Sequence, residues 1–225
     1  MRFERKFIIP FDKKNLIDYF LKTHPLNIRR LFDNRVINNI YLDDLNFKFF
    51  KDNVDGISDR IKIRVRWYGK TFGEIKKPKL EFKIKQNTLG EKKFYKMDNF
   101  FFNENNGIDE KILIKKIQSK VIKNYININF IKPKILNVYN RSYFITNDQH
   151  FRITLDSFPD YYDLEKNKNH LRKVSHFKKY NILEIKYDKK YDKYFQFFIK
   201  YLPLRLDKNS KYVFGVNKIL ENKII

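Results

Sequence analysis

The chain contains no cysteine among its 225 residues, which excludes disulfides, thiolate-bound metals and a cysteine nucleophile. It has only six glycines and six prolines, so it is neither a linker nor a low-complexity segment. No apolar run approaches the roughly 20 residues that span a bilayer, and no apolar signal segment follows the charged residues after Met1. We therefore expect a soluble, cytoplasmic protein without a transmembrane segment.

Histidine is also scarce, and the sequence shows no Ser–His or Cys–His constellation for nucleophilic catalysis. The four histidines are scattered, and we assign them structural or surface roles: His24, His150, His170 and His176.

Aromatic residues and positive charge are abundant. With 23 Phe and 15 Tyr the chain has enough apolar surface for a real core, and we expect one compact domain over residues 1–225. Lys and Arg number 49 against 26 Asp and Glu, a net charge of +23 that repels itself unless an anionic partner is near. Nucleic acid, an anionic membrane and a phosphate-rich ligand all satisfy this requirement. A high content of Lys, Asn and Ile is also typical of proteins encoded by AT-rich DNA. The positions of the basic residues therefore carry more information than their number.

Period-two alternation predicts about eight strands, and three- and four-residue spacing predicts up to four helices. Asp12 is expected to cap the first helix, 103–107 to be a turn and 160–169 a loop. The expected strands cover 2–9, 36–42, 57–68, 80–85, 135–146, 151–155, 170–176 and 181–187, with 91–97 as a further candidate, and the expected helices cover 12–21, 44–52, 108–124 and 191–201. The strands at 135–146 and 151–155 should form a hairpin around Asn147-Asp148. Because strands follow one another with short connections, we predict an α+β fold in which an antiparallel β-sheet closes into a barrel with helices packed outside.

Charged residues on several strands alternate strictly with apolar ones. In 61–67, Lys62, Arg64 and Arg66 share one face while the residues between them are apolar. Further charged rows occur at Glu81, Lys83 and Lys85, at Glu184 and Lys186, and at Glu4 and Lys6. Each row alone is also explained as the solvated face of an amphipathic strand. Together they favour a shared barrel interior, because alternate residues of every strand point into a closed barrel, and rows of like charge repel one another on a solvent face. Arg and Lys bind phosphate oxygens, and a few carboxylates supply ligands for a divalent metal.

Several segments carry a resemblance to a known family, and they lie in order over nearly the whole chain. These segments resemble the VTC domain, the polyphosphate-polymerase branch of the triphosphate tunnel metalloenzymes (the CYTH-like group). The matching segments are Glu4-Arg5-Lys6-Phe7, Ile40-Tyr41-Leu42-Asp43, Ile63-Arg64-Val65-Arg66-Trp67-Tyr68-Gly69, Leu80-Glu81-Phe82-Lys83, Tyr139-Asn140-Arg141, Arg152-Ile153-Thr154-Leu155-Asp156, Leu183-Glu184-Ile185-Lys186 and Ser210-Lys211-Tyr212.

The resemblance implies an eight-stranded antiparallel tunnel that binds ATP, inorganic polyphosphate, triphosphate or pyrophosphate. It implies that the basic residues acting on the phosphates are Arg64, Arg66, Lys83, Arg141 and Lys211, with Lys6 as a further phosphate-binding residue. It also implies that Glu184 binds the divalent metal, Mn²⁺ or Mg²⁺, with Glu4 and Glu81 as further carboxylates. Residues that share faces with these are expected to contribute to substrate binding: Lys62, Lys85, Arg152 and Lys186. Tyr139 either positions phosphates or is a packing aromatic.

One departure bears on the reaction. The wider superfamily opens with ExExK, whereas Arg2 occupies the first position here. The missing carboxylate argues against two-metal hydrolysis and favours the polymerase. A tripolyphosphatase or nucleoside triphosphatase of the same fold is the first alternative, and a polyanion-binding module without catalysis is the second. Nucleic acid is not the expected partner, since the rows lack exposed aromatics for base stacking. A membrane-protein partner stays open.

Overall fold

The computed structural model describes residues 2–87, 89–118, 131–164, 171–174, 180–202, 204–207 and 209–221. Among these residues the helices, apart from two short 3-10 turns at Phe11–Lys13 and Lys189–Tyr191, are α1 (Lys14–Thr23), α2 (Lys48–Val54), α3 (Glu110–Gln118), α4 (Asp192–Ile199) and α5 (Lys211–Glu221). Its strands are β1 (Arg2–Pro10), β2 (Arg29–Asp43), β3 (Arg60–Tyr68), β4 (Gly73–Ile75), β5 (Lys79–Gln86), β6 (Leu89–Lys96), β7 (Phe100–Phe102), β8 (Lys132–Ile145), β9 (Arg152–Asp163), β10 (Arg172–Val174) and β11 (Tyr180–Asp188). No helix in the described ranges is long and apolar enough to cross a membrane.

Most strands belong to one sheet, with the order β1-β11-β9-β8-β2-β3-β5-β6 and with β10 paired to β9. The strand pairs β1–β11, β11–β9, β2–β3, β3–β5 and β5–β6 are all antiparallel. The predicted α+β class with an antiparallel sheet is therefore confirmed. The structure differs from the prediction in the closure of the barrel. Within the described residues the strand order is a path that begins at β1 and ends at β6, and not a ring.

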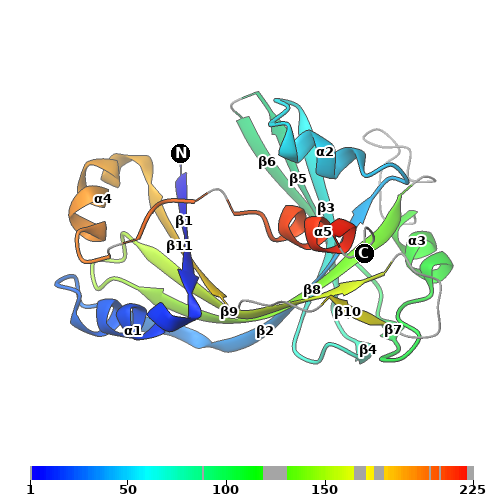
Figure 1. Ribbon diagram of the computed structural model, residues 1–225, viewed down its shortest axis with the longest axis horizontal. Helices are drawn as coiled ribbons and strands as arrows, with labels where there is room; N and C mark the ends of the chain where they lie inside the picture. The colour runs from blue at the N-terminus through cyan, green and yellow to red at the C-terminus, as the bar shows by residue number, and fades with distance from the viewer. Residues whose placement is uncertain are drawn as a thin grey trace. The chain divides into compact units, whose positions relative to one another are not determined.

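The chain forms two compact units, drawn with their strands and helices in Figure 1. Unit 1 consists of Met1–Arg35, Tyr139–Pro159 and His176–Asn209. Its core joins apolar residues of β1, β9 and β11 to those of α1 and α4, because the alternate residues Phe7 and Ile9 face the buried Phe20 and Phe198. The opposite face of β1 and β11 carries Glu4, Lys6, Glu184 and Lys186.

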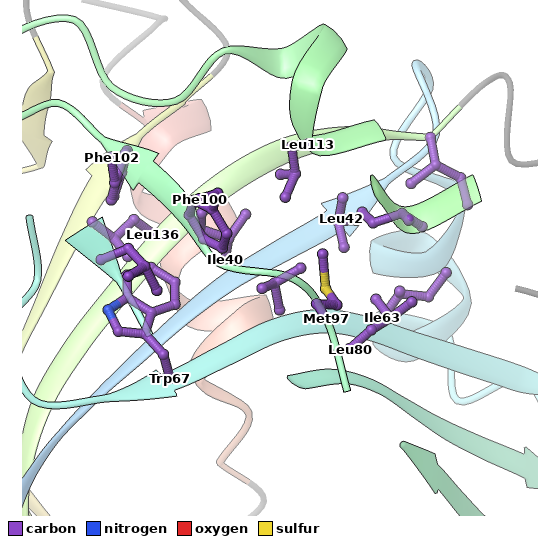
Figure 2. Packing of buried hydrophobic residues seen from close by; sticks show 14 of the residues in the cluster. Ile40, Leu42, Ile63, Trp67, Leu80, Met97, Phe100, Phe102, Leu113 and Leu136 are labelled. Carbon is purple, nitrogen blue, oxygen red and sulfur yellow. The ribbon is translucent and has the colours of Figure 1, made fainter. Parts of the chain in front are cut away.

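Unit 2 consists of Val36–Val138, Asp160–Ser175 and Ser210–Ile225. Figure 2 shows its main core, in which Ile63 and Trp67 of β3 pack with Leu80 of β5 and with apolar residues of β7 and α3. A second cluster joins α5 to the sheet through Tyr212 and Val216, which are almost fully buried. Each unit therefore has its own core, and β3 and β5 each bury one alternate row of side chains.

Several predicted boundaries need correction. Asp12 does not cap α1, because the residue before the helix is Lys13 and no side chain caps it. The helix predicted at 44–52 begins only at Lys48, since the Asp44 carboxylate accepts hydrogen bonds from the backbone N–H groups of Asn46 and Lys48. The loop predicted at 160–169 is wrong for 160–163, which continue β9; its residues 165–169 lie outside the described part, as do 119–124 of the helix predicted at 108–124. The hairpin of β8 and β9 at Asn147-Asp148 is confirmed.

Candidate functional site

In unit 2, β3 presents Lys62, Arg64 and Arg66 on the face opposite its core. The intervening Ile63, Val65 and Trp67 are at most 2% exposed. The antiparallel register sets Lys62 opposite Lys83, and Arg64 opposite Glu81, on β5. The structure thus separates one apolar and one charged face on β3, as the alternation predicts, and sets Lys83 beside Lys62.

Glu81 is the carboxylate that organises this face. Its Oε2 accepts hydrogen bonds from Arg64 Nε at 2.8 Å and Nη2 at 2.6 Å, and its Oε1 accepts one from Lys92 Nζ at 3.1 Å. Arg66 lies 3.8 Å from the same carboxylate. Burial would raise the pKa of Glu81, but the charges of Arg64 and Arg66 outweigh it and lower this pKa to about 2. Both oxygens contact cations, so the structure gives Glu81 the part of a counter-ion that fixes Arg64, and its metal role stays a prediction.

This lowered pKa makes a prediction about acid stability. Because the folded pKa lies below that of an ordinary Glu, about 4.3, Glu81 stabilises the fold fully above about pH 4.5 and loses that contribution as pH falls towards 2. We expect the difference in free energy of unfolding between the wild type and Glu81→Gln to shrink over that interval, by on the order of 3 kcal/mol. Urea unfolding at a series of pH values measures it. The exposed Glu91→Gln serves as the control, and a difference independent of pH would contradict the assignment.

Side chains that sequence reasoning gave no role support the arginines. Asn39 Oδ1 accepts a hydrogen bond from Arg66 Nε at 2.7 Å, and Tyr41 Oη accepts one from Arg64 Nη1 at 3.4 Å. Burial would raise the pKa of Tyr41, but Arg64, Arg66 and Lys211 lower it. The Tyr41 ring stacks on Tyr212 at 5.1 Å, so the position of the Arg64 guanidinium depends on α5.

The N-terminal end of helix α5 also contacts the charged face of β3. Ser210 directly precedes the helix, and its Oγ accepts a hydrogen bond from Lys62 Nζ at 2.8 Å. Tyr212 donates a short hydrogen bond to the buried Asp43, which also accepts bonds from the backbone of α2. Sequence analysis did not predict this helix, although Tyr212, Val216 and Ile219 have helical spacing and are buried. Lys211 is the first residue of α5 and is near enough to Tyr41 to lower the pKa of its hydroxyl.

Unit 1 gathers a second charged cluster on β1 and β11. The register sets Lys6 opposite Glu184 and Glu4 opposite Lys186. Lys186 contacts Glu184 directly and lies 3.7 Å from Glu4 Oε2, while Lys6 lies 3.0 Å from Glu4 Oε1. Arg152 of β9 is exposed and pairs with Lys186 in the register. The structure therefore brings together all the unit 1 residues predicted on these strands.

Glu184 is 5% exposed. Burial alone would raise its pKa, but Lys186, Lys6 and Arg141 together hold the pKa well below its usual range, so Glu184 is ionised at neutral pH. Lys6 is held in turn by a hydrogen bond that its Nζ donates to the Asn209 carbonyl at 3.2 Å.

Arg141 in β8 is fixed by Asp156, a residue that the sequence motif contains but that sequence reasoning gave no role. Asp156 is fully buried, and its oxygens accept hydrogen bonds from Arg141 Nε at 2.5 Å and Nη2 at 2.7 Å. This is the two-point geometry that holds a guanidinium in one plane. The Tyr139 ring lies 5.4 Å from the Arg141 guanidinium and is 2% exposed, which favours packing and cation–π contact over direct phosphate binding.

The side chains available as metal ligands limit which metal ion could bind. In the described residues no group of three Asp, Glu, His or Cys side chains is placed to hold a metal ion. Glu184 and Glu4 supply carboxylate oxygens around Lys186. Such a set fits Mg²⁺ or Mn²⁺, hard cations that keep water molecules and take further oxygens from substrate phosphates.

Thirty-four chains of known structure match this fold. A candidate adenylyl cyclase from Hippeastrum, reported to have a dominant triphosphatase activity, is 13% identical with a TM-score of 0.55, covering 96% of each chain. A candidate adenylate cyclase from Bacillus halodurans is 13% identical, with a TM-score of 0.54 and 95% of each chain covered. A protein from Pyrococcus horikoshii OT3 is 11% identical with a TM-score of 0.51, covering 98% of this chain and 99% of that one. No curated protein matches.

The VTC domain model matches residues 1–220, so the chain belongs to the VTC domain family.

Proposed function

We propose that this chain is a polyphosphate polymerase that transfers the γ-phosphoryl group of ATP to the end of an inorganic polyphosphate chain. The observation that carries the proposal is the same in both units: Arg and Lys side chains share one face of the strands and are held by a buried carboxylate whose pKa is lowered. Membership of the VTC domain family supports it. Because the family match includes residues of both units, the proposal keeps the chain as a single domain over 1–225.

In the proposed reaction the bond between the γ-phosphorus and its bridging oxygen breaks, and a terminal oxygen of the acceptor chain bonds to that phosphorus. ADP leaves and the chain grows by one phosphate. A terminal phosphate oxygen is already ionised and needs no strong general base, which agrees with the lack of a Ser–His or Cys–His constellation in the sequence. Positioning and electrostatic stabilisation supply most of the acceleration in such transfers.

Every predicted residue except Tyr139 has a part in this proposal. Arg64 and Arg66 bind oxygens of the transferred group, oriented by Glu81 and Asn39. Residues that neutralise the remaining phosphates are Lys6, Lys62, Lys83, Lys85, Arg141, Arg152, Lys186 and Lys211. Glu184, with Glu4, would hold Mn²⁺ or Mg²⁺, which supplies further charge neutralisation on the phosphates.

The test is a product assay. Purified protein incubated with ATP and Mn²⁺ is expected to accumulate long-chain polyphosphate, seen as a ladder on a polyacrylamide gel, together with ADP. Omission of the metal should stop the synthesis. Release of free phosphate without polymer would overturn the polymerase proposal.

A hydrolase is the second candidate. The observation that favours it is the triphosphatase activity reported for the similar structure from Hippeastrum. Hydrolysis requires a positioned water, and the residue that would complete a fuller set of carboxylates on β1 is Arg2 here. The same assay separates the two, because a hydrolase converts tripolyphosphate or ATP to free phosphate. A non-catalytic module would bind these anions and consume none of them.

A further inference from the structure

Tyr41 in β2 combines a buried ring with a hydroxyl group on the charged face of unit 2. The residue is 5% exposed, and its ring stacks on that of Tyr212 with 5.1 Å between the centroids. The register pairs Tyr41 directly with Arg64 of β3, so both side chains lie on the same face of the sheet. A phenylalanine would stack on Tyr212 equally well. The hydroxyl group therefore needs an explanation of its own.

The hydrogen bonds of this hydroxyl are incomplete. A phenol both accepts and donates. Tyr41 Oη accepts a long hydrogen bond from Arg64 Nη1 at 3.4 Å, but its own proton has no acceptor among the residues that the structure describes. Its stacking partner shows the usual arrangement, because the buried Tyr212 hydroxyl donates to the Asp43 carboxylate. Since a buried donor without an acceptor destabilises the fold, the Tyr41 hydroxyl fits a role in binding a ligand.

The charges around the hydroxyl indicate the ligand's chemistry. Burial would raise the pKa of Tyr41, but the charges of Arg64, Arg66 and Lys211 lower it. Positive charge beside the oxygen polarises the O–H bond and makes it a stronger donor. The same three cations attract an anion, whose oxygens are acceptors. Low exposure does not separate Tyr41 from the site, because Arg66, which the proposed function places on the transferred group, is itself only 9% exposed.

We propose that Tyr41 is a further substrate-binding residue, whose hydroxyl donates a hydrogen bond to an oxygen of the phosphate bound by Arg64. This inference rests on the proposed function, because it names a further contact to the phosphates in that reaction. The proton stays on Tyr41 Oη, so no acid or base step is added to the phosphoryl transfer. Arg64 Nη1 continues to donate to the same hydroxyl oxygen, and each hydrogen bond in this chain strengthens the next.

The experiment measures the binding of tripolyphosphate by titration calorimetry, which requires no turnover. Tyr41→Phe removes the hydroxyl and keeps the ring that stacks on Tyr212. We expect its affinity for tripolyphosphate to fall about 10- to 100-fold, the usual effect of one hydrogen bond to a charged group. Its free energy of unfolding in urea should equal or exceed that of the wild type, because the buried O–H group has no acceptor in the described part of the free protein.

The matched control is Tyr187→Phe. Tyr187 is 1% exposed and packs in the apolar core of unit 1, and its hydroxyl donates to Asp192 Oδ1 at 2.7 Å. This variant also loses one buried phenolic hydroxyl, but one whose hydrogen bond is made within the protein. It should unfold at a lower urea concentration than the wild type and bind tripolyphosphate with unchanged affinity.

A third variant, with 3-fluorotyrosine at position 41, separates donation from acceptance. Fluorine makes the phenol a stronger hydrogen-bond donor and a weaker acceptor. At mildly acidic pH, where the phenol keeps its proton, this variant should bind tripolyphosphate more tightly than the wild type. Weaker binding would show that the hydroxyl serves only as an acceptor for Arg64, and would overturn the inference.

The remaining outcomes also decide the matter. Wild-type affinity in Tyr41→Phe, an equal loss of affinity in Tyr187→Phe, or a marked loss of stability in Tyr41→Phe would each overturn the inference. If the wild type releases only phosphate from ATP while Tyr41→Phe still binds tripolyphosphate weakly, the inference is supported and the polymerase proposal fails. Polymer synthesis by the wild type together with unchanged affinity in Tyr41→Phe would have the reverse meaning.

Discussion

Glu184→Gln is expected to reduce ATP-dependent polymer synthesis by about 100- to 1,000-fold, the usual loss when one group that stabilises transferred charge is removed. The substitution keeps the size of the side chain and removes its charge. Lys186 would lose its buried ionic partner, and the proposed metal would lose its main carboxylate. Synthesis measured as polymer per ADP formed, with Mn²⁺ varied, gives the rate, and electron paramagnetic resonance of Mn²⁺ gives the metal affinity independently of turnover.

The same variant should bind tripolyphosphate as tightly as the wild type or slightly more tightly, because one negative charge leaves a cluster that also contains Lys6 and Arg141. Retained binding separates lost catalysis from lost folding. The control is Glu74→Gln, which removes a carboxylate that is 58% exposed and lies in unit 2. Polymer synthesis at the wild-type rate by Glu184→Gln would show that this carboxylate has no part in the reaction.

The alternating strands were the most predictable part of the molecule. On β3 the spacing alone distinguishes the buried Ile63, Val65 and Trp67 from the charged side chains between them, because side-chain direction in a strand has a fixed period of two. The strands at 2–9, 57–68, 80–85 and 181–187 were located for that reason, within a few residues. Helix boundaries were less predictable, because Asp43 and Asp44 bind backbone N–H groups and delay the start of α2.

The partners of the charged residues could not be predicted from the pattern. Asp156 and Asn39 lie 15 and 27 positions from the arginines they hold, and only the sheet register brings them together. Glu81 illustrates the same limit. Its ExK spacing is equally compatible with a metal ligand and a counter-ion, and the distinction comes from Arg64 and Lys92, which lie on neighbouring strands that spacing does not reveal. Closure of the sheet likewise depends on strand curvature, about which alternation says nothing.

Asp156→Asn should lower the free energy of unfolding by about 3 to 5 kcal/mol, which is a large loss for a single substitution. Asp156 is fully buried, and the side chain of Arg141 is only 14% exposed. An asparagine accepts at most part of the two-point interaction and leaves the guanidinium without a counter-charge. Urea unfolding measures the change as a lower midpoint with an unchanged slope.

Asp160→Asn is the matched control, because Asp160 also pairs with a cation, Lys173, at 2.9 Å, but is 42% exposed. Solvent screens such a pair, so the loss should stay below about 1 kcal/mol. The double variant Arg141→Met/Asp156→Leu tests the reason for the difference. Replacing both charges by apolar groups should restore most of the stability, because no buried charge is left unpaired, yet polyphosphate synthesis should remain absent because the phosphate-binding guanidinium is gone. If the double variant were as unstable as Asp156→Asn, the instability would come from packing around β8 and β9 and not from the unpaired Arg141 charge.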